Sequence, residues 1–122
     1  MRRGTRARIR LDAIRHNLQT IKNMAPGCNV MAVIKANAYG HGLIPVARAL
    51  EAADALAVAR LTEAFQLRDA GISKTLTLLG GVLSADDLAA ALDIDVHIGI
   101  HHEQQIRWVE EAGCSIPMAW LK

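Results

Sequence analysis

Short, unbroken apolar runs recur along the chain, and this recurrence limits the possible folds more than any other feature. A continuous apolar run indicates a strand that is buried on both faces, as in a parallel sheet covered by helices. Strands that alternate with helices over the whole length predict successive right-handed βαβ units. The five predicted strands cover residues 30–34, 55–59, 75–79, 96–100 and 116–121.

Helices are predicted between these strands from the spacing of apolar residues and from residues that end helices. Asp12, Thr62 and Ser84 occupy plausible N-cap positions. Gly71 and Gly113 follow the ends of two helices, where glycine can take the left-handed conformation. We expect a first helix that stops near residue 26, and further helices around residues 43–52, 62–70, 84–92 and 102–112.

The N-terminal stretch differs from the remainder in charge. The net charge of the chain is +2, yet residues 1–10 contain five Arg and no acidic residue. Arg6, Arg8 and Arg10 alternate with apolar residues, which predicts a short strand with one solvated face. A basic arm could instead bind the phosphates of nucleic acid, but no aromatic residues for base stacking lie among these arginines. We therefore favour the strand.

Several classes of protein are excluded by composition. Hydrophobic residues make up 52% of the 122 residues, too many for a disordered chain. No apolar segment approaches the roughly 18 residues of a membrane span, and no apolar leader follows the charged start.

Cys28 and Cys114 are far apart and indicate neither a disulfide framework nor a zinc site. His97 and His101 would lie about 13 Å apart on one strand face, too far for one metal ion. We expect a soluble, cytoplasmic protein without a metal.

Length restricts the architecture further. A complete (β/α)8 barrel needs about 250 residues, so five strands cannot close one. A flavodoxin-like open sheet could hold five strands. The sequence stops immediately after an apolar strand, which we interpret as a cut within a longer protein.

The residues that could carry out chemistry follow directly after the first buried strand. Lys35 lies where this strand enters a loop of small residues, and loss of hydration there favours the neutral amine that attacks aldehydes. Gly40 and Gly42 allow close backbone approach, and the helix that begins near Leu43 offers an N-terminus suited to a phosphate. Taken alone, a lysine in this position is more often a solvated strand end than a nucleophile, and His41 is more often a surface or packing histidine than an acid or base.

Residues 32–42 read Ala-Val-Ile-Lys-Ala-Asn-Ala-Tyr-Gly-His-Gly. This string closely resembles the pyridoxal-phosphate attachment motif of the alanine racemase family. Residues 10–18, 57–64, 78–81 and 120–122 resemble further segments of the same family. The resemblance covers the whole chain, but only the first third of such an enzyme.

The resemblance implies a role for three residues. Lys35 matches the lysine that holds pyridoxal 5'-phosphate as an internal aldimine and serves as one of two proton-transferring bases. Tyr39 matches the tyrosine whose hydroxyl binds the cofactor phosphate. Lys122 matches a lysine that is N-carboxylated in many members, where the carbamate orients an arginine. The implied enzyme is an isomerase that interconverts L-alanine and D-alanine and supplies D-alanine for peptidoglycan.

The resemblance also implies parts that these residues lack. The second base would be a tyrosine from the C-terminal β domain of a partner subunit, so we expect a homodimer with a shared active site. The expected fold is the N-terminal portion of a (β/α)8 barrel over residues 12–122, with about five parallel strands. Residues 1–11 would form a strand that pairs with a separate β domain.

Two other functions stay open. A related racemase of broader specificity, acting for example on serine, would share this segment. A non-catalytic pyridoxal-phosphate homeostasis protein would share the barrel, although such proteins lack the Asn-Ala-Tyr-Gly-His-Gly continuation. We expect neither a nucleic acid nor a membrane partner.

Overall fold

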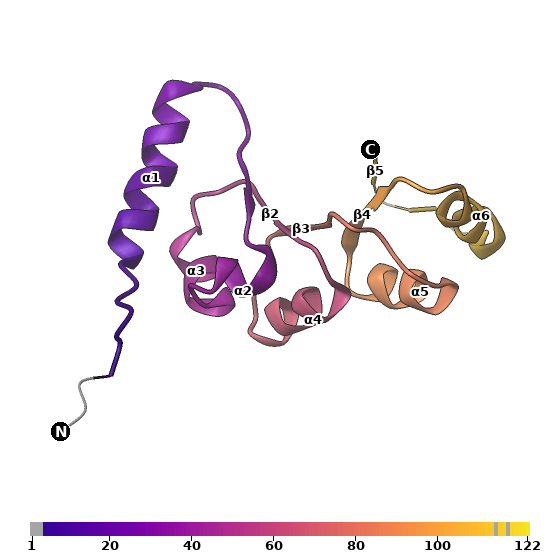
Figure 1. Ribbon diagram of the computed structural model, residues 1–122. Coiled ribbons are helices and arrows are strands. Elements are labelled where there is room, and N and C mark those ends of the chain that lie inside the picture. Colours follow the sequence, from indigo (N-terminus) through magenta and orange to yellow (C-terminus); the bar gives the residue numbers. More distant parts are fainter. Residues whose placement is uncertain (1–3, 114, 117) are drawn as a thin grey trace.

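Five parallel strands form one sheet in the computed structural model, which describes residues 4–113, 115–116 and 118–122 (Figure 1). The order is β1-β2-β3-β4-β5, and all four neighbouring pairs are parallel. A flavodoxin-like sheet reverses its order at a switch point, whereas a barrel adds each strand beside the previous one. The prediction of a partial barrel is confirmed. The strands are β1 Met31–Val33, β2 Ala55–Val58, β3 Thr75–Leu78, β4 Val96–Ile100 and β5 Ala119–Leu121.

Helices alternate with the strands, and α3 to α6 follow one another along the sheet (Figure 1). A short helical segment, α2, lies between β1 and α3. The longest described helix has 14 residues, and no described helix is both long and apolar enough to cross a membrane. The helices are α1 Leu11–Met24, α2 Lys35–Tyr39, α3 Leu43–Ala49, α4 Leu61–Asp69, α5 Ala85–Asp93 and α6 Glu103–Ala112.

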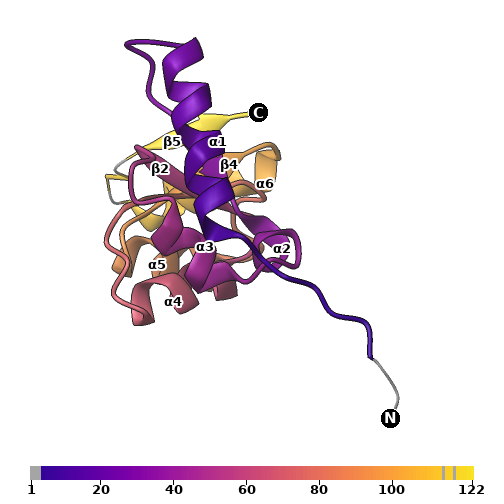
Figure 2. The ribbon, with the colours of Figure 1, turned by 90° about the vertical axis from the view of Figure 1, so that its left-hand side faces the viewer.

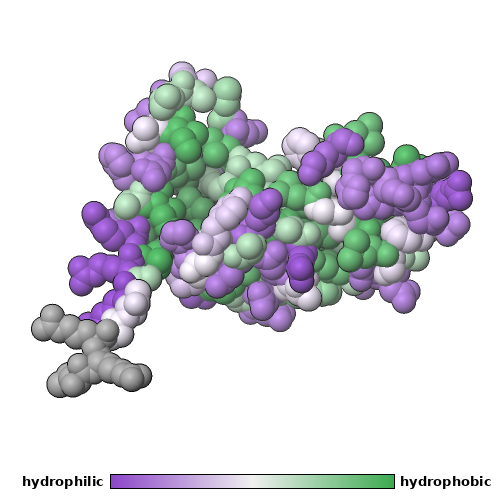
Figure 3. Space-filling view, in the orientation of Figure 1, coloured by the Kyte–Doolittle hydropathy of each residue, from purple (hydrophilic) through white to green (hydrophobic). Residues whose placement is uncertain are grey.

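The core lies between the sheet and the helices. Leu56, Leu76 and Ile98 come from neighbouring strands and are at most 1% exposed. Leu67 of α4 and Leu88 of α5 complete this layer. Figure 3 shows hydrophobic residues gathered between α1 and the sheet, and hydrophilic residues over α6. Burial of about 25 cal/mol per Å² of apolar surface makes this layer the main stabilising term.

Burial on both faces was predicted for every strand, and this prediction is wrong for the two outermost strands, β1 and β5. All four residues of β2 are buried. Val33 of β1 is 40% exposed, and Leu121 of β5 is 86% exposed. No described strand flanks β1 or β5 on the outer side, so their side chains lack the neighbours that cover β2.

Helix ends follow the predictions in part. Ser84 caps α5, because its hydroxyl accepts the Asp87 N–H at 3.0 Å. Gly71 and Gly113 both have positive φ, as predicted. Thr62 is not an N-cap, because α4 begins one residue earlier, after Arg60.

Asp12 is not an N-cap either, because α1 already begins at Leu11. Its carboxylate lies in the first turn and accepts a hydrogen bond from the Arg10 guanidinium at 2.9 Å. That bond holds the pKa of the Asp12 carboxyl below its usual value. Both side chains are exposed, so this pair stabilises the helix little.

The N-terminal segment runs away from the body of the molecule (Figure 2). Residues 4–10 form no strand and are exposed. A strand needs a partner to satisfy its backbone groups, and no described residues lie beside this segment to pair with it. The predicted pairing with a separate β domain stays a prediction. Residues 1–3 and Cys114 lie outside the described residues.

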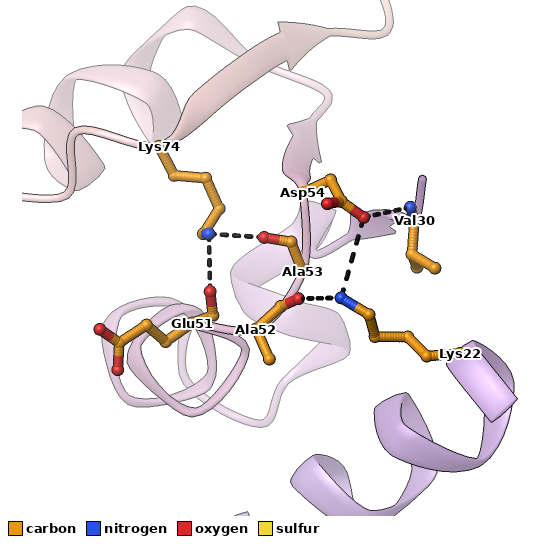
Figure 4. A network of polar contacts seen from close by, with 7 residues as sticks. All are labelled: Lys22, Val30, Glu51, Ala52, Ala53, Asp54 and Lys74. Carbon is orange, nitrogen blue, oxygen red and sulfur yellow. Dashed lines mark hydrogen bonds and ion pairs between the residues drawn. The ribbon is translucent and has the colours of Figure 1, made fainter. Parts of the chain in front are cut away.

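Two lysines hold the α3–β2 connection at the amino-terminal edge of the sheet (Figure 4). Lys22 of α1 donates to the Ala52 carbonyl at 2.7 Å and lies 4.0 Å from the Asp54 carboxylate. The same carboxylate accepts the Val30 N–H at 2.6 Å. One acidic side chain thus joins α1, the start of β1 and the start of β2.

Lys74 holds the same connection from the other side (Figure 4). Its ammonium donates to the Glu51 carbonyl at 2.8 Å and to the Ala53 carbonyl at 2.5 Å. Because Lys74 precedes β3, these bonds fix the connection to the next strand along the sheet.

Arg68 of α4 binds the segments that precede β3 and β4 in the same way. Its guanidinium donates to the carbonyls of Ile72 and Lys74, each at 2.8 Å, and to those of Ile94 and Asp95, each at 2.9 Å. Partial burial lowers the pKa of Arg68 from its ordinary value, and the Asp95 carboxylate acts in the opposite direction. One planar side chain thereby satisfies four carbonyls that no ladder bond reaches.

We expect Arg68→Ala to lower the free energy of unfolding by about 3 kcal/mol, since four hydrogen bonds of the ordinary net strength are lost. Urea unfolding of the protein would measure the change. Arg107→Ala is the matched control, because among the described residues Arg107 forms an ion pair only with the exposed Glu103 of its own helix. Its loss should cost at most about 0.5 kcal/mol. Equal effects of the two substitutions would contradict the role given to Arg68.

Candidate functional site

A hollow of about 420 Å³ lies at the carboxyl edge of the sheet. The parallel strands all end at this edge, so each can contribute a residue to one site. The lining residues follow β1, β2, β3, β4 and β5, and they are Lys35, Ala59, Leu79, Gly80, His101 and Lys122. Two residues singled out from the sequence, Lys35 and Lys122, thus line one hollow. Lys122 is held there by its N–H, which donates to the Ile100 carbonyl at 2.9 Å.

The surroundings of Lys35 differ from the expectation. Ile34, the preceding residue, is 2% exposed, whereas Lys35 itself is exposed. The expected loss of hydration is therefore absent here. The reason lies in the fold, because the five described strands leave the hollow open instead of enclosing it.

The segment after Lys35 is a left-handed turn and not the predicted loop. Ala36, Asn37, Ala38 and Tyr39 have φ values of 52°, 55°, 53° and 55°. For residues other than glycine, this conformation costs about 1–2 kcal/mol per residue. Such a run persists only where the surrounding structure holds it. The sequence signal for this turn was weak, because alanine has no preference for it.

Asn37 organises the turn through its side chain and its carbonyl. Its Oδ1 atom accepts the Leu43 N–H at 2.9 Å, at the start of α3. Its carbonyl accepts the Gly40 N–H at 3.1 Å and the Gly42 N–H at 3.0 Å. The N–H of Leu43 is thus already bonded and is not available to an anion. Asn37 was missed from the sequence, although asparagine tolerates the left-handed region better than most residues.

Glu63 links this turn to the next strand–helix unit. One carboxylate oxygen, Oε2, accepts the Asn37 N–H at 3.3 Å. The other, Oε1, accepts the Arg60 N–H at 3.2 Å. Glu63 was also missed, because a glutamate in the first turn of a helix ordinarily indicates only a capping interaction.

Tyr39 lies on the same turn as Lys35 but does not line the hollow. Its side chain is 59% exposed. The phenol is therefore accessible from solvent on the element that carries the lysine.

His101 was not expected in the site and lines the hollow. Its Nε2 atom lies 3.0 Å from the Gly80 carbonyl, and its backbone N–H donates to Gln105 Oε1 at 2.9 Å. Gln105 is 4% exposed and also donates to the Val82 carbonyl at 3.1 Å. The described residues bring no three His, Cys, Asp or Glu side chains close enough to hold a metal ion.

The hollow therefore presents two primary amines and an imidazole beside small and apolar residues. A primary amine in its neutral form bonds covalently to carbonyl compounds such as aldehydes. This chemistry requires an amine that a ligand can reach, and exposed Lys35 meets that requirement.

Gly81 allows the β3–α5 loop to lie close to β4, because glycine has no Cβ. We therefore expect Gly81→Ala to lower the free energy of unfolding by about 3 kcal/mol. A Cβ there would meet the Gly99 carbonyl and would lie 2.6 Å from Gln105 Nε2. Gly71→Ala is the matched control, because Gly71 also has positive φ but has open space around it. We expect about 1 kcal/mol for the control. Thermal unfolding of both variants checks the difference, and equal losses would refute the close packing.

Comparison with known sequences assigns most of the chain to one family. The family described as "Alanine racemase, N-terminal domain" matches residues 9–120. An alanine racemase from Aeromonas hydrophila is 47% identical over 117 residues, which are 95% of this chain and 33% of the relative. A biosynthetic alanine racemase from Escherichia coli K12 is 47% identical over 111 residues, covering 90% of this chain and 31% of the relative. The chain spans about a third of the length of these curated relatives.

Solved structures show the same fold. The crystal structure of biosynthetic alanine racemase from Pseudomonas aeruginosa is similar with a TM-score of 0.84 and 41% identity, over 91% of this chain and 32% of that one. The alanine racemase structure from Acinetobacter baumannii is similar with a TM-score of 0.83 and 36% identity, over 86% and 31% of the two chains.

Proposed function

This chain belongs to the family of the alanine racemase N-terminal domain, and from that premise we propose that it is the front part of a pyridoxal-phosphate-dependent enzyme that interconverts L-alanine and D-alanine. The observation that carries the proposal is the placement of Lys35 at the carboxyl end of β1, within the family's attachment motif and beside Lys122. The D-alanine would be used in the cytoplasm for peptidoglycan precursors.

The residues of the hollow fit the cofactor. The Lys35 amine is exposed in a hollow of about 420 Å³, where an aldehyde can reach it. Pyridoxal phosphate, when bound, delocalises the electron pair that remains after the α-proton of an amino acid is removed. The protein has to hold this group, orient it and move the proton.

Lys35 and Tyr39 divide these tasks in the proposal. Lys35 would hold the cofactor through its side-chain amine and, as a free amine, would accept or return the α-proton on one face of the substrate. Tyr39 donates its hydroxyl hydrogen to the cofactor phosphate. Both residues lie on α2, so a single backbone segment sets their separation.

Lys122 is proposed to be N-carboxylated by carbon dioxide. Lys35 and Lys122 line the same hollow, so two ammonium groups would repel each other there. Carbon dioxide would add to the neutral Lys122 amine, and the protons of the former ammonium group that are lost would pass to solvent. One positive charge is then replaced by a negative one, and the repulsion becomes attraction. The carbamate would also orient an arginine from another part of the enzyme.

We place the second base outside these residues. Racemisation needs a proton donor on the face opposite Lys35, and the sequence has a single Tyr, which is already assigned. We propose that a tyrosine from the C-terminal β domain of a partner subunit supplies it, in a homodimer with shared active sites.

We expect Lys35→Ala in the full-length protein to abolish the cofactor adduct that borohydride traps, together with alanine racemisation. Of the residues that line the hollow, Lys35 and Lys122 alone carry a side-chain amine. Peptide mass mapping after reduction, with circular dichroism of L-alanine incubations, measures both losses. Lys35→Arg is the matched control, since it keeps the positive charge but cannot form the bond. A wild-type adduct on any other lysine would contradict the proposal.

The same assay separates the alternatives. Faster racemisation of serine than of alanine by the wild type would indicate a broader-specificity racemase. An adduct at Lys35 without racemisation of any amino acid would indicate a protein that only binds the cofactor.

We expect Tyr39→Phe to weaken cofactor affinity about tenfold, because one hydrogen bond to a charged phosphate is lost. Tyr39 is 59% exposed, so removal of the hydroxyl should leave the stability of the fold nearly unchanged. Titration of the cofactor-free protein with pyridoxal phosphate measures the affinity, and thermal unfolding serves as the control. Unchanged affinity would remove Tyr39 from the site.

A further inference from the structure

We propose that Glu63 is a positioning residue for Lys35, because its carboxylate holds in place the left-handed turn that begins at this lysine. The inference rests on the function proposed for Lys35, although the structural part of it can be tested without the cofactor. The contact is the hydrogen bond from the Asn37 N–H to Glu63 Oε2, at 3.3 Å.

The turn is otherwise held by local bonds. The Ala38 N–H donates to the Ile34 carbonyl at 2.9 Å, and the Gly40 N–H to the Asn37 carbonyl at 3.1 Å. These bonds lie within one strand–helix unit, as does the bond from the Leu43 N–H to Asn37 Oδ1, and Ala38 of the turn packs in the core. Among the hydrogen bonds of the described residues, the one to Glu63 alone ties residues 35–40 to another strand–helix unit.

Glu63 lies where it can fix the turn after Lys35 relative to β2. It is the third residue of α4, which follows directly on β2, and β2 pairs with β1. Its other carboxylate oxygen is occupied by the Arg60 N–H at 3.2 Å, so the carboxylate cannot rotate freely. Glu63 and Lys35 also line a second hollow of about 540 Å³, which places the two side chains on one surface.

Helix capping alone does not require this arrangement, as α5 demonstrates. Asp87 is the third residue of α5 and accepts the Leu83 N–H of its own loop at 3.2 Å. Like Glu63, it accepts a backbone N–H from the entry to its own helix, although Leu83 precedes the N-cap Ser84 by one residue, and it makes no hydrogen bond to the turn after Lys35. Asp87 provides a matched control for the loss of a capping carboxylate.

The test compares Glu63→Gln with Asp87→Asn in the full-length protein. An amide keeps the size of the side chain, but one of its two polar atoms becomes a donor facing an N–H donor. In the cofactor-free protein, we expect amide hydrogen exchange of residues 36–40 to become about tenfold faster in Glu63→Gln, the scale of one lost bond to a charged acceptor. Asp87→Asn should leave exchange of this segment unchanged.

A second measurement addresses Lys35 directly. Titration with pyridoxal phosphate, followed by borohydride trapping, should show affinity about tenfold weaker in Glu63→Gln and unchanged in Asp87→Asn. Glu63→Asp shortens the side chain by one methylene group and keeps its charge. It should behave like Glu63→Gln, and it keeps the test usable if the amide variant fails to fold.

Each outcome decides the inference. Wild-type exchange and wild-type affinity in both Glu63 variants would overturn it, and so would equal losses in the Glu63 and Asp87 variants, which indicate general destabilisation. A wild-type protein with no adduct at Lys35 would overturn the proposed function instead. The exchange measurement would then still decide whether Glu63 holds the turn.

Discussion

Parallel pairing of the strands in sequential order is the constraint on which the other features depend. It stacks Leu56, Leu76 and Val96 into one buried row beneath the helices. Apolar burial favours this layer, and the backbone ladder sets the register within it. The same pairing places the ends of all five strands at one edge, where Lys35 and Lys122 come together. The site is therefore a consequence of the way in which the core is built.

The two edges of the sheet are stabilised by different means. At the amino-terminal edge, long basic side chains such as Lys74 and Arg68 donate to carbonyls of the connecting loops. These bonds fix the loops to the start of the neighbouring strands. At the carboxyl edge, the backbone itself is strained, in the left-handed turn of residues 36–39. Strain of this kind is common where a backbone must present a functional side chain, and here it adjoins Lys35.

The site combines an exposed amine with a supported backbone. Lys35 is open to solvent, whereas the turn beside it is fixed by Asn37 and Glu63. Among the described residues, the amine is thus exposed beside a backbone that is held in place. His101, bonded to the Gly80 carbonyl, shows that the loop after β3 is also tied to the strand next to it.

The sequence by itself determined the alternation of strands and helices, because continuous apolar runs and helical spacing are local patterns. The string at residues 32–42 is long enough to be specific, and it led to the predictions for Lys35 and Tyr39. The prediction for Lys122 came from the shorter resemblance at residues 120–122, and all three roles stay predictions. Strand limits were predicted to within one residue at each end for the four strands before β5. The remaining error arises because apolar residues at the strand ends do not show where pairing stops.

Only the tertiary structure decided the rest. The left-handed turn depends on bonds from Asn37 to Leu43 and from Glu63 to Asn37, and the second of these spans residues far apart in the chain. The exposure of Lys35 and of the edge strands depends on which neighbours are present, and no local pattern reports that. The start of α4 at Leu61 likewise depends on which side chain accepts the backbone N–H at the helix entry, here Glu63 from Arg60. Local periodicity specifies elements, whereas long-range contacts specify their ends, their strain and their surroundings.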